Sequence, residues 1–161
     1  LVDGFIKAGL DNCELHFYGT GELVPWLKEI GENHHQIKYM GCVTNDEIVR
    51  LQCEATLLVN PRPSDKEFCK YSFPSKTIEY MASGTPVLMT KLPGVPDEYF
   101  NHVYTIEEEN ASSLSKTLKK LFELPSEDLQ KKGLQARLFV SNEKGCIKQA
   151  EKVVAFLEEI G

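Results

Sequence analysis

The chain of 161 residues has no apolar run long enough to cross a membrane, and its first residues lack the basic segment followed by a hydrophobic stretch that marks a secretory signal. It also lacks an excess of positive charge. The net charge of −6 excludes the basic footprint of a nucleic-acid-binding protein and a whole-chain attraction to anionic lipid. We therefore expect a soluble, cytoplasmic protein with no nucleic-acid partner and at most peripheral contact with the inner face of a membrane.

Cysteine pairs at short spacing are absent as well. The five cysteines are an odd number, and they do not combine with the histidines into a set spaced like metal ligands. We therefore expect reduced thiols and no metal site. The sequence also has no internal repeat, no low-complexity tract and no long block of like charges.

The composition is that of one globular domain, with 42% hydrophobic and 26% charged residues. Helical and strand patterns alternate along the chain. The expected helices cover 1–10, 24–30, 46–52, 74–83, 110–123, 126–139 and 144–159, and the expected strands cover 14–18, 37–41, 55–60, 86–89 and 103–105. This alternation predicts an α/β fold, a Rossmann-like and mostly parallel sheet with helices on both faces.

Ligands bind such sheets beyond the carboxyl ends of the strands. Three expected strands end in unusual loops, at 19–21, 41–44 and 60–64, and the helix beginning at Pro74 follows the third loop. Gly19 and Gly21 in the first loop suit either a close backbone approach to a ligand or a plain tight turn. In the second loop, Thr44 and Glu47 form a capping box for the next helix. We expect these loops to converge on one rim of the sheet.

The segment 73–88 carries the most chemical information. Pro74 lacks only an N–H that would be unpaired in a first helical turn, so the amides around Ser75 are left to face an anion. Glu79 lies one turn further along, on the same helix face as Ser75. This arrangement can hold a diphosphate at the helix start and offer a carboxylate to the hydroxyls of an attached sugar. The segment therefore predicts a nucleotide-diphosphate site.

Two cations flank this helix start. Arg62 can pair with a diphosphate bidentately, whereas Lys76 acts as a compact charge. Each is otherwise a solvated surface cation. Tyr71 and Phe73 form either an aromatic wall of the site or a packed anchor for the loop.

The stretch from Glu79 to Val87, with its small-apolar run and Gly84-Thr85-Pro86-Val87, resembles the donor-binding signature of retaining glycosyltransferases of family 4. The resemblance covers nearly the whole chain, and its specific part is 72–88. It implies the carboxy-terminal, donor-binding half of a two-domain GT-B transferase, which moves a sugar from a nucleoside diphosphate sugar, of UDP or GDP type, to an acceptor with retention at the anomeric carbon. The family generally works without a bound metal, so no cofactor is expected.

The resemblance also implies roles for single residues. Glu79 matches the glutamate that contacts the ribose, but the family's second glutamate, eight positions earlier, is replaced by Tyr71. Glu67, on the same loop, is our hypothesis for a substitute, and with Arg62 and Lys76 it forms the expected catalytic set. The remaining expected donor-binding residues are Ser72, Phe73, Pro74, Ser75, Gly19, Gly21 and the main chain of Cys42 and Val43 at the nucleobase.

The segment 71–76 looks like that of hexosyltransferases of bacterial capsule, exopolysaccharide or lipopolysaccharide assembly. Family members also carry an amino-terminal acceptor domain and a first strand followed by an Arg/Lys pair that grips the phosphates. We therefore expect residues 1–161 to be a donor-binding domain truncated at its amino-terminal side, inactive alone, whose saccharide or lipid-linked acceptor binds to the missing domain.

Three alternatives remain open. One is a nucleotide-sugar epimerase, which shares this GT-B half. Another is a non-catalytic nucleotide-sugar-binding or regulatory subunit that pairs with a separate acceptor protein. A receiver-type signalling domain is the third on fold alone, but it requires an acidic cluster at the ends of the early strands, and residues 19–21 do not supply one.

Overall fold

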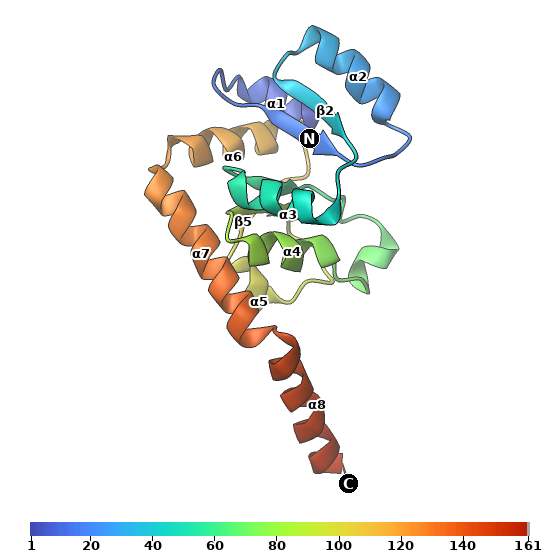
Figure 1. Ribbon diagram of the computed structural model, residues 1–161, viewed down its shortest axis with the longest axis vertical. Coiled ribbons are helices and arrows are strands. Elements are labelled where there is room, and N and C mark those ends of the chain that lie inside the picture. Colours follow the sequence, from blue (N-terminus) through green and yellow to red (C-terminus); the bar gives the residue numbers. More distant parts are fainter. Residues whose placement is uncertain (161) are drawn as a thin grey trace. The chain divides into compact units, whose positions relative to one another are not determined.

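The computed structural model describes residues 1–160 (Figure 1). The helices are α1 Val2–Ala8, α2 Val24–Asn33, α3 Asn45–Glu54, α4 Ser75–Ser83, α5 Asp97–Phe100, α6 Ala111–Glu123, α7 Ser126–Glu143 and α8 Cys146–Ile160, with a 3-10 helix η1 at Glu67–Lys70. The strands are β1 Leu15–Tyr18, β2 Ile37–Gly41, β3 Leu58–Asn60, β4 Val87–Thr90 and β5 Tyr104–Ile106. No helix within residues 1–160 is long and apolar enough to span a membrane.

The predicted α/β fold is confirmed. All strand pairs recorded for the described residues are parallel, with β1 beside β2 in one sheet and β3, β4 and β5 in sequence order in another. Parallel pairing follows from the alternation of strands and helices, because each helix returns the chain to the starting end of the sheet.

The chain divides into two compact units. The first comprises residues 1–51 and 107–123. Its helix α1 packs on α6, where Gly4 permits the approach because a Cβ at this position would lie 2.6 Å from Leu114 Cδ2. In the same unit α2 packs on β2, and Leu15 of β1 pairs with Ile37 of β2.

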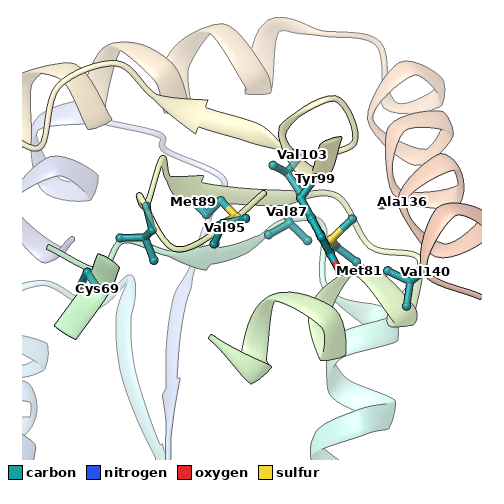
Figure 2. Close-up of a cluster of buried hydrophobic side chains, with 10 residues drawn as sticks. Cys69, Met81, Val87, Met89, Val95, Tyr99, Val103, Ala136 and Val140 are labelled. Carbon is teal, nitrogen blue, oxygen red and sulfur yellow. The ribbon is translucent and has the colours of Figure 1, made fainter. Parts of the chain in front are cut away.

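The second unit comprises residues 52–106 and 124–160. All four residues of β4 are buried, and the hydrophobic cluster around this strand draws on α4, α5, α7 and η1 (Figure 2). Its buried members are Cys69, Met81, Val87, Met89, Leu92, Val95, Tyr99, Val103, Ala136 and Val140. The core of this unit therefore includes Met81 of α4, the helix with the predicted anion site.

Helix α7 lies close against the turn that ends α4. A Cβ added to Gly133 would stand 2.1 Å from the carbonyl oxygen of Gly84 and 2.8 Å from the nitrogen of Pro86. Gly84 itself has φ of 82°, in the left-handed region that stops a helix at low cost with glycine. The end of α4 is thus fixed by two glycines.

Several element bounds differ from the prediction. Strand β3 begins at Leu58, which pairs with Val87, rather than at residue 55. The residue before Val87 is Pro86, which has no N–H to donate and so does not extend the pairing to the residues before Leu58. The helices η1 and α5 were not predicted, because each is only four residues long and shows no helical period. Helix α8 lies where a helix was expected, and all of its residues are exposed.

Candidate donor-binding site

Helix α4 begins one residue later than predicted. Pro74 is its N-cap residue, with φ of −72° and ψ of 113°, rather than a member of the first turn. The first backbone hydrogen bond of the turn runs from the Thr77 N–H to the Pro74 carbonyl, at 2.9 Å. The N–H groups of Ser75 and Lys76 precede that bond, and both residues are exposed. The helix start can therefore face an anion, as expected.

The carboxylate of Glu79 lies one turn into the helix and is about two thirds covered, with 34% of its side chain exposed. Lys76 Nζ donates to both of its oxygens, at 2.9 and 3.0 Å. The amide Nε2 of Gln52, from α3, donates to Oε1 at 2.6 Å. Burial alone raises the pKa of Glu79, but the hydrogen bonds from Gln52 and Lys76 outweigh it and hold this pKa below its ordinary value. Glu79 is thus an anion at neutral pH.

Gln52 and Thr85 are members of this site that sequence reasoning missed. Gln52 is only 4% exposed, and its main-chain carbonyl accepts a 2.6 Å hydrogen bond from Thr85 Oγ1. A signal was present in the sequence. Gln52 follows Ile48 by four residues and so continues the inward stripe of α3, where an apolar side chain is the usual occupant.

The loop before α4 is anchored in the core of the second unit. The ring of Phe73 lies 4.9 Å from that of Tyr99, which in turn meets Phe139 of α7 edge-on at 5.2 Å. Gly94 fits closely beneath the same loop, because a Cβ there would stand 2.7 Å from the carbonyl oxygen of Ser72. Phe73 is therefore a packed anchor, one of its two expected roles, and Ser72 is held beside it.

Arg62 and Glu67 lie on the loop between β3 and α4. The guanidinium of Arg62 stacks on the ring of Phe68, 5.5 Å from its centroid, and Arg62 is half-buried. Glu67 is the first residue of η1 and is exposed. Asn60, at the carboxyl end of β3, has a buried side-chain nitrogen for which residues 1–160 supply no hydrogen-bond partner. The rim of this sheet thus presents polar groups where ligands bind in α/β folds.

The other expected contacts belong to the first unit. Gly19 has φ of 113°, which favours glycine, and its N–H donates to the carbonyl of Gly41 at 2.8 Å. This bond brings together the loops that follow β1 and β2. Cys42 is exposed and Val43 half-buried, and Gly21 is exposed with open space around it.

One half of the predicted capping box of α3 is confirmed by a 3.3 Å bond from the Glu47 N–H to Thr44 Oγ1, and the reciprocal contact of the Glu47 side chain stays a prediction. The convergence of these loops with the start of α4 stays a prediction.

The parallel strands flanked by helices define an α/β protein of Rossmann-like fold, and the start of α4 can face an anion. The family model described as Glycosyl transferases group 1 matches residues 3–123. This range includes every strand described for residues 1–160 and every residue expected to contact the donor. The chain therefore belongs to the group 1 glycosyl transferases, whose members act on a sugar donor and an acceptor. A search of curated protein sequences gave no match.

Proposed function

We propose that the chain is the donor-binding half of a retaining hexosyltransferase that uses a nucleoside diphosphate sugar, of UDP or GDP type, in the assembly of a bacterial surface polysaccharide. Membership of the group 1 glycosyl transferases supports sugar transfer. The observation that carries the donor proposal is the start of α4, where the amides of the exposed residues Ser75 and Lys76 lie one turn from the anionic carboxylate of Glu79.

The diphosphate sits at the start of α4 in this proposal. Free N–H groups and the positive end of the helix dipole favour negative charge there. Lys76 adds a full positive charge, and Arg62 supplies a planar donor set suited to phosphate oxygens. Cleavage of the bond to the sugar leaves more charge on the departing diphosphate, so these groups stabilise the transition state more than the bound donor. The proposal requires no metal ion.

Glu79 accepts hydrogen bonds from the ribose hydroxyls. Its carboxylate offers two acceptor oxygens, which suits a pair of neighbouring hydroxyl groups. Lys76 contacts the same oxygens, so one lysine links the ribose contact to the diphosphate. Glu67 takes the place of the family's earlier glutamate, close to the transferred sugar. In the first unit, the main chain at Cys42 and Val43 is the proposed contact of the nucleobase, and Gly19 and Gly21 are proposed donor contacts.

The acceptor, a saccharide or a lipid-linked saccharide, binds to an amino-terminal domain in this proposal. Residues 1–161 then bind the donor without transferring its sugar. This assignment places the protein in the cytoplasm, where nucleotide sugars are available, with peripheral contact at the inner face of the membrane.

Calorimetric titration with UDP, GDP and ADP tests the proposal. We expect one base to bind best, and we expect Glu79→Gln to weaken that binding about tenfold, which corresponds to the roughly 1.4 kcal/mol of a hydrogen bond to a charged group. Glu127→Gln, in the first turn of α7, is the matched control and should leave the affinity unchanged.

The 2′,3′-dideoxy form of the best nucleotide separates the ribose role from a general charge effect. If Glu79 contacts the ribose hydroxyls, this analogue binds wild type and Glu79→Gln about equally. Failure of all three nucleotides to bind the folded chain would contradict the proposal.

A further inference from the structure

We propose that Gln52 is a positioning residue of the donor site, which holds the Glu79 carboxylate in the orientation that meets the ribose, and that Thr85 in turn fixes Gln52. The inference rests on the proposed function, because it assigns the device that prepares the ribose contact. It concerns Gln52, which lies outside the segment 73–88 that first indicated the site, and Thr85, which lies within that segment but had no expected role.

The burial of Gln52 is the first argument. A side-chain amide that is 4% exposed costs free energy unless its hydrogen bonds are made. Its Nε2 makes a 2.6 Å bond to Oε1 of Glu79. A bond to an ionised acceptor is stronger than one between neutral groups, so this contact is well able to fix the carboxylate. An apolar residue at this position would fill the same space and leave Glu79 without its buried donor.

The second argument is that Gln52 is itself held in place. It lies in the last turn of α3, where carbonyl groups have no partner within the helix. Its carbonyl accepts instead from Thr85 Oγ1, at 2.6 Å, and Thr85 is 4% exposed. The N–H of Thr85 donates to Ser83 Oγ at 3.1 Å. Thr85 directly follows Gly84, so the segment that ends α4 also secures the end of α3.

The third argument is the contrast with Lys76. The lysine side chain is 55% exposed and lies on the same helix as Glu79, three residues away. Exposed pairs of this kind are weak and move readily. Gln52 comes from another helix and is buried, so it supplies the fixed direction that Lys76 cannot. A carboxylate already fixed before the donor arrives loses less conformational freedom on binding.

A double-mutant cycle tests the assignment. Gln52→Met keeps the side-chain volume and removes the donor, and we expect it to weaken binding of the best nucleoside diphosphate about fivefold, less than a bond made directly to the ligand. In the Glu79→Gln background the same substitution should have no further effect, because Gln52 acts through the carboxylate. An equal loss in both backgrounds would overturn the proposal.

Variants of Thr85 give a second test, which can be made even if the variants of Gln52 do not fold. Thr85→Val removes the hydroxyl and keeps the shape, and it should weaken nucleotide binding in the same direction. Thr85→Ser restores the hydroxyl and should return the affinity to that of wild type. If serine and valine weaken binding equally, the hydroxyl has no positioning role and the account of Thr85 is wrong.

A measurement without ligand separates this inference from the proposed function. The pKa of Glu79, followed by carboxyl carbon NMR in the free protein, should rise in Gln52→Met, because the amide bond stabilises the charged form. Lys76 remains as the charged group in contact with Glu79. If no nucleotide binds but this pKa rises, the donor proposal fails while the Gln52–Glu79 contact stands. An unchanged pKa would overturn the contact itself.

Discussion

Replacing Gly133 by alanine is expected to destabilise the second unit strongly. In an open helix the change from glycine to alanine stabilises by up to about 1 kcal/mol. Here the added Cβ would stand 2.1 Å from the Gly84 carbonyl oxygen and 2.8 Å from the carbonyl carbon of Thr85. These neighbours are main-chain atoms, so they cannot turn aside as the end of a side chain can. Helix α7 has to shift away from the turn.

Overpacking a core typically costs about 1–3 kcal/mol of stability. We expect the cost of a clash with backbone atoms to lie at the upper end of that range or above it. After the gain in helix propensity we expect a net loss of about 2–3 kcal/mol in the free energy of unfolding. For a chain of this length that loss lowers the melting temperature by roughly 5–10 °C.

Thermal unfolding followed by circular dichroism measures this shift. Gly21→Ala is the matched control, because a Cβ there meets nothing within 4 Å, and its melting temperature should stay close to that of wild type. If the Gly133→Ala protein is as stable as wild type, or more stable, the backbone of α7 does not pack directly against the backbone of residues 84–86, and the prediction is wrong.

Two further predictions concern the charges of the site. The ratio of the nucleotide affinity of wild type to that of Glu79→Gln should stay constant from neutral pH down to about pH 5. Because the pKa of Glu79 is lowered, this ratio should fall only below the ordinary glutamate pKa of about 4.3. Calorimetry across this pH range checks the prediction, and a fall that begins near pH 6 would contradict it. Lys76→Met should weaken the binding of a nucleoside diphosphate about tenfold and reduce the salt dependence of its affinity, but leave the binding of a nucleoside unchanged. Titrations at two ionic strengths measure both effects. An equal loss of affinity for the nucleoside would argue against a phosphate contact.

The sequence was most informative where local chemistry decides the structure. Pro74 marks the start of α4 because proline is favoured at helix starts, and Gly84 marks its end because glycine adopts positive φ at low cost. The sequence therefore predicts the bounds of this helix to within one residue. Val87, Leu88 and Met89 of β4 were equally clear from their continuous apolar character, although the strand begins and ends one residue later than predicted. The length of strand β3 was overestimated, because its pairing starts beside Val87, and Pro86, just before β4, has no N–H to extend the ladder.

The site was less predictable where it depends on contacts between distant parts of the chain. Gln52 meets Glu79 across 27 residues of sequence, and Thr85 meets the Gln52 carbonyl across 33. The position of Gln52 on the inward stripe of α3 indicates that it is buried, but neither contact has a local pattern, because the stripe does not show which side chain a buried glutamine meets. The stacking of Arg62 on Phe68 is likewise a matter of how the loop closes. The choice of Glu67 as the second carboxylate stays a prediction.

The most direct test of the central claim is the amide NMR spectrum of the chain titrated with the nucleoside diphosphate that binds best. If a diphosphate lies at the start of α4, the N–H signals of Ser75 and Lys76 shift most, and the matching nucleoside, which has no phosphate, leaves them unmoved. Saturable binding that shifts signals elsewhere while these two amides stay in place would contradict the account.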